Sequence, residues 1–167
     1  MSLKVSEILR NRRAMVALGI GVLVMASGAY LFYVSYGAPA PSFAPSRLTV
    51  GGKTFAIAYV AANQSAWVSG LMNKKITNTT IMLFVFPKPA IYSFWMYDTN
   101  TSLDIIWLSE TGAVGDVVYV VAGAPSCYVS ADCTTYTPPS AANLVIEARA
   151  GFAQANGITV GTVIRFG

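Results

Sequence analysis

The sequence predicts a mainly β domain, a compact barrel-like or sandwich-like fold with one or two short helices, attached to one N-terminal transmembrane α-helix. Two observations lead to this fold class. Of the 167 residues, 54% are hydrophobic and only 11% are charged, whereas soluble domains have roughly 25% charged residues. Beyond residue 46, short aromatic and β-branched runs alternate with Gly, Pro, Asn and Asp, which is typical of strands joined by turns.

Residues 14–36 are predicted to form the transmembrane helix. They include no charged residue, and at about 1.5 Å per residue they can cross the roughly 30 Å hydrocarbon layer. Four basic side chains precede them: Lys4, Arg10, Arg12 and Arg13. The positive-inside bias therefore places residues 1–13 in the cytoplasm and the rest of the chain outside the cell membrane, with the helix in contact with lipid.

A cleaved signal peptide is the alternative to a retained helix. Ala38-Pro39-Ala40 has the small-residue pattern of a cleavage site. However, the apolar run is longer than the h-region of a signal peptide, and Pro41 directly after the site should hinder cleavage. These observations favour a retained, single-pass anchor.

Small residues mark one stripe of the predicted helix: Ala17, Gly21 and Gly28. The spacing of Ala17 and Gly21 allows a second helix to approach closely. Gly and Ala are also common in membrane helices without a packing role. The stripe is thus either a contact face for an integral membrane protein partner or ordinary composition.

Residues 37–46 should form an extended Pro-rich linker, and residues 47–167 an extracytoplasmic β-rich domain. The domain has seven Lys or Arg residues against six Asp or Glu residues. It is therefore close to neutral, which argues against nucleic acid as a partner. So few charges are unusual for an exported domain, and they indicate that glycans, hydroxyls or other proteins cover its surface.

Patterning predicts the elements of this domain in order. Gly51-Gly52 should join a hairpin of residues 47–50 and 53–61, and Asn63 should cap a short helix within residues 62–72. The further expected elements are strands at residues 81–86, 92–97, 103–108, 117–121, 144–147 and 162–166, and a helical turn at residues 150–156.

Cys127 and Cys133 are the two cysteines of the chain. Outside the cytoplasm such a pair is expected to form a structural disulfide. A redox role is disfavoured because the spacing is not Cys-x-x-Cys, and a metal site is disfavoured because the chain has no histidine. We expect no metal and no cofactor.

Three Asn-x-Ser/Thr tripeptides begin at Asn63, Asn78 and Asn100, all in the predicted outer domain. They are acceptor sites for N-glycosylation if the organism glycosylates exported proteins. Such tripeptides also arise by chance.

Several sequence blocks occur in the order found in a widespread bacterial and archaeal family. They are Gly70-Leu71-Met72, Met82–Phe86, Ser93–Met96, Thr99, Leu103–Ile106, Gly112, Glu147 and Gly157–Gly161. With these blocks the chain resembles the domain of unknown function 192 family from about Leu48 to Phe166. The resemblance implies a β-rich, exported or lipid-anchored domain, and it implies no particular activity.

The chain also departs from the usual family pattern at three places. Lys74 stands where the family usually has Arg, and Ile81 where it usually has Gly. Tyr97-Asp98-Thr99 replaces a usual Lys-Asn-Thr. A polar family site around that Asn would be altered in this chain.

Candidate chemistry is sparse, because a chain without histidine cannot have a Ser-His-Asp triad. Asp98 and Asp104 stand at the ends of a tight connection and could approach each other as the acid and base of a hydrolase. The alternative, which we favour, is that both carboxylates accept hydrogen bonds from nearby backbone groups.

Trp95 and Tyr97 could offer a stacking platform for a ligand. In a strand both would point to one face, opposite Phe94 and Met96. That face is either open to a ligand or simply covered by other residues.

Three functional hypotheses follow. The first is a non-catalytic accessory or structural subunit of a larger membrane assembly. The second is an extracytoplasmic module that binds a carbohydrate or another small ligand around Trp95, Tyr97, Asp98 and Asp104. A hydrolase that uses Asp98 and Asp104 is the third, and it is the one we favour least.

Overall fold

The computed structural model describes residues 43–167. The predicted cytoplasmic segment 1–13, the predicted membrane helix 14–36 with Ala17, Gly21 and Gly28, and most of the linker 37–46 lie outside the described residues. Between Phe43 and Gly167, no helix is long and apolar enough to cross a bilayer.

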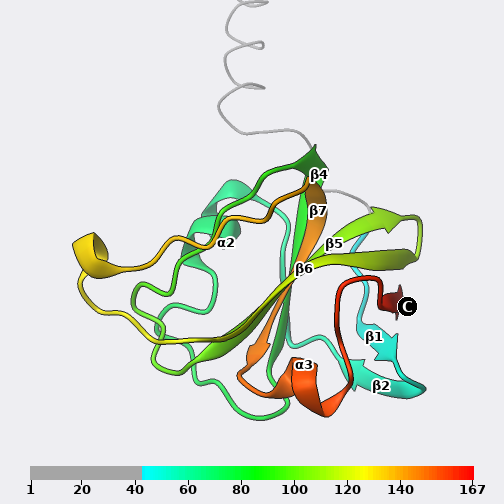
Figure 1. Cartoon of the computed structure of the whole chain (residues 1–167), viewed down its shortest axis with the longest axis horizontal. Coiled ribbons are helices and arrows are strands. Elements are labelled where there is room, and N and C mark those ends of the chain that lie inside the picture. The colour runs from blue at the N-terminus through cyan, green and yellow to red at the C-terminus, as the bar shows by residue number, and fades with distance from the viewer. Residues whose placement is uncertain (1–42) are drawn as a thin grey trace, which may run out of the picture. The chain divides into compact units, whose positions relative to one another are not determined.

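An eight-stranded sheet organises the described residues (Figure 1). The strands are β1 (Arg47–Val50), β2 (Lys53–Ala56), β3 (Tyr59–Ala61), β4 (Ile81–Ala90), β5 (Leu103–Thr111), β6 (Val114–Ala124), β7 (Ala142–Arg149) and β8 (Val163–Phe166). Short helices connect some of them, namely α2 (Gln64–Ser69), α3 (Phe152–Ala155) and the 3-10 helix η1 (Ser130–Asp132). The strand order is β2-β1-β8-β6-β5-β7-β4-β3, and only the β3–β4 pair is parallel.

The sheet curls into a half-barrel. Its two edge strands, β2 and β3, are separated in the chain only by Ile57 and Ala58. The Ile57 amide donates to the Ser46 carbonyl and the Ala58 amide to the Ile81 carbonyl, both at 2.9 Å. Two extended residues reach only about 7 Å, so the edges must approach each other there. The prediction of a mainly β, barrel-like domain with few short helices is confirmed.

The central strands β4, β5 and β7 are buried on both faces. Alternate residues on these strands, such as Leu83, Ile106 and Ile146, belong to a first core together with β1, β8 and α3. The residues between them, such as Phe84 and Trp107, belong to a second core. The second core is covered by α2 and by segments 91–99 and 125–137. Burial on both faces explains the continuous apolar runs of these strands.

Residues 92–97 do not form the predicted strand. Only isolated bridges occur there, from Phe94 to Tyr136 and from Tyr97 to Cys127. In the sheet, β5 already pairs with β6 on one side and β7 on the other. Residues 92–97 therefore cannot pair with β5 as a further strand. Segment 91–99 instead lies over the second core, where Met96 is buried and the Tyr92 and Phe94 side chains are partly buried. The predicted strand 53–61 is likewise divided into β2 and β3.

Cys127 and Cys133 form the predicted disulfide, with their Cα atoms 5.6 Å apart. Closing so short a loop contributes about 2 kcal/mol through the unfolded state. The bonded loop also supports segment 91–99, because the Asp98 amide donates to the Cys127 carbonyl at 2.9 Å.

Candidate ligand-binding site

Helix α2 forms one wall of a cavity over the second core. Asn63 caps the helix as predicted, since its Oδ1 accepts a hydrogen bond from the Ala66 amide at 3.0 Å. The Trp67 indole then fixes the helix to the sheet, because its Nε1 donates to the carbonyls of Ala61 and Val85 at 3.0 and 3.2 Å. The helix ends at Gly70, whose φ of +44° favours glycine.

Segment 91–99 forms the opposite wall. Phe94 exchanges two backbone hydrogen bonds with Tyr136, and the Trp107 indole donates to the Tyr92 carbonyl at 2.8 Å. These bonds hold the aromatic rings of the segment against β4. The Tyr92 ring stacks on Phe86 with a centroid distance of 3.7 Å, and Phe94 meets Phe84 edge to face at 4.8 Å.

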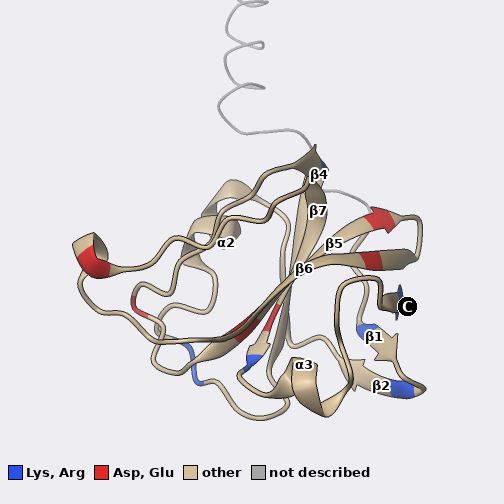
Figure 2. Cartoon of the chain, in the orientation of Figure 1, with Lys and Arg blue, Asp and Glu red and all other residues tan. Residues whose placement is uncertain are grey.

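Between the two walls lies a cavity of about 440 Å³, the size of a small-molecule site. Six aromatic side chains line it: Trp67, Phe84, Phe86, Tyr92, Phe94 and Trp95. Val68 and Ile91 also line it, and both are exposed, as is Trp95. The cavity therefore reaches the surface. Figure 2 shows no Lys, Arg, Asp or Glu on α2. The walls are therefore largely apolar.

Glu147 also lines this cavity. It lies on β7, where it pairs with Met82 on one side and Ile105 on the other. The side chain is only 4% exposed, and its Oε2 has no hydrogen-bond partner among the described residues. A Cβ atom at Gly70 would lie 3.8 Å from this oxygen. Glycine at the end of α2 thus keeps the space next to the carboxyl open.

Burial raises the pKa values of the two titratable side chains that line the pocket. Desolvation raises the pKa of the Glu147 carboxyl to about 8, because a carboxylate in an apolar site loses the solvation that water provides. Desolvation also raises the pKa of the Tyr92 phenol. These are the two titratable side chains that line the cavity. Glu147 is therefore mostly neutral at pH 7.

Trp95 is placed at the rim of this cavity, and Tyr97 is its neighbour. The Trp95 side chain is 43% exposed, and its ring lies 5.4 Å from the Tyr97 ring between centroids. Tyr97 itself is not among the residues that line the cavity. Trp95 therefore belongs to the pocket, whereas Tyr97 supports it from outside.

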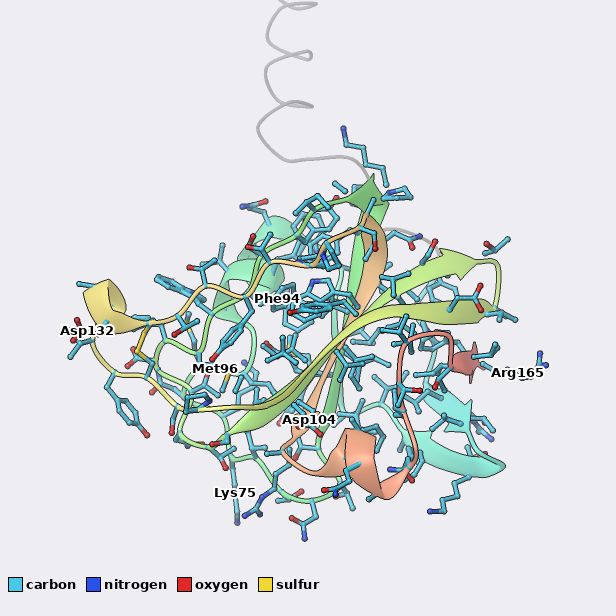
Figure 3. All side chains as sticks on the ribbon, viewed as in Figure 1. Lys75, Phe94, Met96, Asp104, Asp132 and Arg165 are labelled. Atoms are coloured by element: carbon cyan, nitrogen blue, oxygen red, sulfur yellow. A yellow bond between two sulfur atoms is a disulfide. The ribbon has the colours of Figure 1, made fainter. Side chains whose placement is uncertain are left out.

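Neither Asp98 nor Asp104 lines the pocket. Asp98 lies in a turn with a φ of +51°, where its carbonyl accepts from the Asn73 amide at 3.0 Å. Asp104 is 1% exposed, and its carboxylate accepts hydrogen bonds from the amides of Gly123, Gly151 and Ala153. Figure 3 shows Asp104 beside α3. The two aspartates thus hold separate parts of the backbone.

The chain matches one known protein family over most of its length. Residues 46–166 match the family described as "Uncharacterized ACR", domain of unknown function 192. The chain belongs to this family. The resemblance noted in the sequence blocks is thereby confirmed for nearly the whole described domain.

Two solved structures share the fold of this family member. One is described as a putative transcription regulator from Sinorhizobium meliloti 1021, with 20% identity, a TM-score of 0.61, and coverage of 78% of this chain and 98% of the other. The second is a protein of unknown function from Novosphingobium aromaticivorans DSM 12444, with 22% identity, a TM-score of 0.59, and coverage of 80% and 96%. No curated protein matches the chain. At these identities the likeness shows the fold alone.

Glu147 is the pocket residue that sequence reasoning passed over. In the sequence it is one of the family blocks, and it stands directly after the apolar run Leu144-Val145-Ile146 and before Ala148. A lone carboxyl in a strand buried on both faces is a signal of function, because such a group costs stability. The burial of this carboxyl can be recognised only once β7 is known to be a central strand.

Each asparagine of the three glycosylation tripeptides is exposed, whereas Thr80 of the second tripeptide is buried. Asn63 caps α2, and the Oδ1 of Asn78 accepts from Arg149 at 2.9 Å. Asn100 differs, because its Nδ2, the atom that would carry a glycan, donates to the Lys74 carbonyl at 3.3 Å.

The described residues include no group of three or more His, Cys, Asp or Glu side chains that could hold a metal ion. The carboxyl that lines the pocket is that of Glu147, and six aromatic side chains line the pocket with it.

Proposed function

We propose that this chain is a membrane-anchored, extracytoplasmic module that binds a small organic ligand in the pocket between α2 and segment 91–99. The observation that carries the proposal is the unpartnered Oε2 of Glu147 in the wall of a surface-accessible cavity. A buried carboxyl without a hydrogen bond lowers stability. A bound ligand would supply the missing partner.

Membrane anchoring in this proposal rests on the sequence. The charge-free run 14–36, the basic residues before it and the Pro-rich segment 37–46 support an N-terminus in the cytoplasm and a pocket outside it. The function is proposed as binding rather than catalysis, because Glu147 is the one carboxyl among the residues that line the cavity.

Ligand binding can be tested on the full chain in mild detergent with a library of small organic fragments. Trp67 and Trp95 line the cavity, so a bound fragment should change the tryptophan fluorescence. Trp95→Ala should weaken binding at least about tenfold, since aromatic side chains in binding sites often contribute more than 1.4 kcal/mol.

Tyr128→Ala is the matched control. Tyr128 is an exposed aromatic residue on the disulfide loop, outside the lining of the cavity. Its removal should leave fragment affinity unchanged. If no fragment binds, or if every fragment binds the Trp95→Ala variant as tightly as the wild type, the pocket is not a ligand site.

An accessory subunit of a membrane assembly is the second candidate, favoured by the disulfide loop. Tyr128 and Val129 lie between the two cysteines and are 62% and 58% exposed. Apolar side chains held outward on a constrained loop suit contact with another protein. The charge-poor domain and the small-residue stripe of the predicted helix support the same function.

Co-purification from native membranes tests this second function. Gly21→Leu keeps the predicted span apolar but should block close approach of a partner helix, and a Tyr128→Ser, Val129→Ser double variant should weaken contact outside the membrane. We expect each change to reduce the recovery of an integral membrane partner severalfold, while Trp95→Ala does not. A wild-type protein that migrates as a lone monomer would contradict the subunit function.

A further inference from the structure

The walls of the Glu147 pocket favour a positively charged ligand with an apolar body. Its aromatic rings meet at several angles, stacked at 9° for Phe86 and Tyr92 and edge to face at 87° for Phe84 and Phe94. The six aromatic side chains that line the cavity come from α2, β4 and segment 91–99. The negative faces of such rings attract cations.

The charged side chains that line the pocket also favour a cationic ligand. No Lys or Arg lines the cavity, whereas Glu147 does. An anionic ligand would therefore meet no positive partner and would face a carboxyl. A ligand with many hydroxyls would find few polar side chains, since the neutral ones are Gln64, Ser69, Ser93 and Thr99.

Once ionised, Glu147 can accept a hydrogen bond from a donor of the ligand. Its Oε2 is buried and without a partner, and an ionised carboxylate only accepts hydrogen bonds. A protonated amine has an N–H donor for this oxygen and a positive charge that attracts the carboxylate.

We infer that the ligand is an organic amine with an aromatic or aliphatic body, bound as an ammonium ion. This inference rests on the function proposed above. The N–H group of the ligand donates to the Glu147 carboxylate, and its apolar part packs against Trp67, Phe86 and Trp95. A cavity of about 440 Å³ accommodates a body of one or two rings.

Binding of an ammonium ion should release a proton. With a pKa of about 8, Glu147 is mostly protonated at pH 7 before the amine binds, and it must ionise to pair with the ammonium. The carboxyl proton then passes to solvent while the amine keeps its own. The neighbours of Glu147 add no compensating charge: Met82 and Ile105 flank it, and Tyr92 is the other titratable group in the lining. Asp104, beside Ile105, pairs with Ala148 and so points to the opposite face.

Calorimetric titration of the full chain in mild detergent tests this inference. Four probes are compared: 2-phenylethylamine, 2-phenylethanol, phenylacetate and glucose. The amine should bind at least about tenfold more tightly than the alcohol of the same shape. In buffers of different ionisation enthalpy it should release close to one proton at pH 7, and its affinity should rise about tenfold from pH 6 to pH 7.

Glu147→Gln is the decisive variant. It keeps the shape of the side chain but cannot ionise, so it should abolish both the proton release and the preference for the amine over the alcohol. Asp116→Asn, at an exposed position on β6, is the matched control and should change neither.

The outcomes separate this inference from the function on which it rests. If the alcohol, phenylacetate or glucose binds as tightly as the amine, or if the amine binds without releasing a proton, the ligand class is wrong but the pocket remains a binding site. If none of the four probes binds while the fragment library yields ligands of other chemistry, the ligand class is again wrong. If neither the probes nor the library binds, both proposals fail.

Discussion

Replacing Glu147 with Gln is expected to stabilise the protein at pH 8 by several kcal/mol and to give no stabilisation at pH 4.5. Burial raises the pKa of the carboxyl from 4.5 to about 8. At about 1.4 kcal/mol per pKa unit, keeping this group buried at pH 8 costs roughly 5 kcal/mol of unfolding free energy. Glutamine has no charge to bury, so it avoids this cost.

The sign follows from which state binds the proton. Below pH 4.5 the carboxyl is protonated in both the folded and the unfolded chain, and its contribution is constant. Between pH 4.5 and about 8 only the unfolded chain loses the proton, so the wild-type protein loses stability as the pH rises. At the low end of this range the Gln amide, which also lacks a partner, should make the variant equal to or slightly less stable than the wild type.

Urea unfolding of the full chain in mild detergent, followed by circular dichroism between pH 4.5 and 9, measures the difference. The wild-type curve should fall across this range, and the Glu147→Gln curve should be flatter. Asp116→Asn removes an exposed carboxyl from the same sheet and should leave the shape of the wild-type curve unchanged. Parallel curves for the wild type and the Glu147→Gln variant would mean that the carboxyl is solvated or paired.

The local pattern of the sequence predicted most of the strands because their signals are local. Gly51 and Gly52 have φ values of +57° and +75°, which is why a Gly-Gly pair between two alternating runs indicated the hairpin. Asn63 likewise caps α2 through its own side chain. Such features depend on neighbouring residues, so the chain reveals them without the tertiary fold.

The strand predicted at residues 92–97 does not form, because strand propensity alone does not determine which segments join a sheet. Its aromatic residues have high strand propensity, yet strand pairing needs a partner with free backbone groups. Because β6 and β7 occupy both sides of β5, the segment is held by side chains and by two isolated bridges instead. Propensity describes a residue's fit to a sheet, whereas the order of the strands decides which segments enter it.

The candidate site was predicted only in part for the same reason. Trp95 was identified from a local aromatic cluster, and the structure places it at the rim of the pocket. Glu147 comes from a strand about fifty residues away, and its position depends on β4 and β5 lying on either side of β7. A site assembled from distant strands cannot be read from spacing.

Asp104→Asn is expected to destabilise the fold by about 3 kcal/mol or more. The carboxylate Oδ1 accepts from the Gly123 amide at 2.8 Å, and Oδ2 accepts from the amides of Gly151 and Ala153 at 3.0 and 2.8 Å. Asparagine has only one carbonyl oxygen, so its NH₂ group must face an amide donor in place of an acceptor. Hydrogen bonds to a charged group are worth about 1.5–3 kcal/mol, and each buried donor left unpaired adds a further cost.

Part of this cost should fall on α3. The residue before the helix, Gly151, has no side chain to cap it, and Asp104 on β5 supplies the acceptor for its first amides instead. Hydrogen exchange in the Asp104→Asn variant should therefore speed up most at residues 151–155, and the urea midpoint of the full chain should fall. Asp98→Asn is the matched control with little expected change, because asparagine tolerates the φ of +51° at this turn.

The same variant separates the structural and functional explanations of Asp104. Its side chain points to the first core, opposite the face of the sheet on which Glu147 lines the pocket. Variant protein that remains folded should therefore bind pocket ligands with wild-type affinity. If Asp104→Asn instead left the urea midpoint unchanged and weakened ligand affinity tenfold, the carboxylate would belong to the ligand site, and the hydrogen bonds to Gly151 and Ala153 would not be what holds α3 on the sheet.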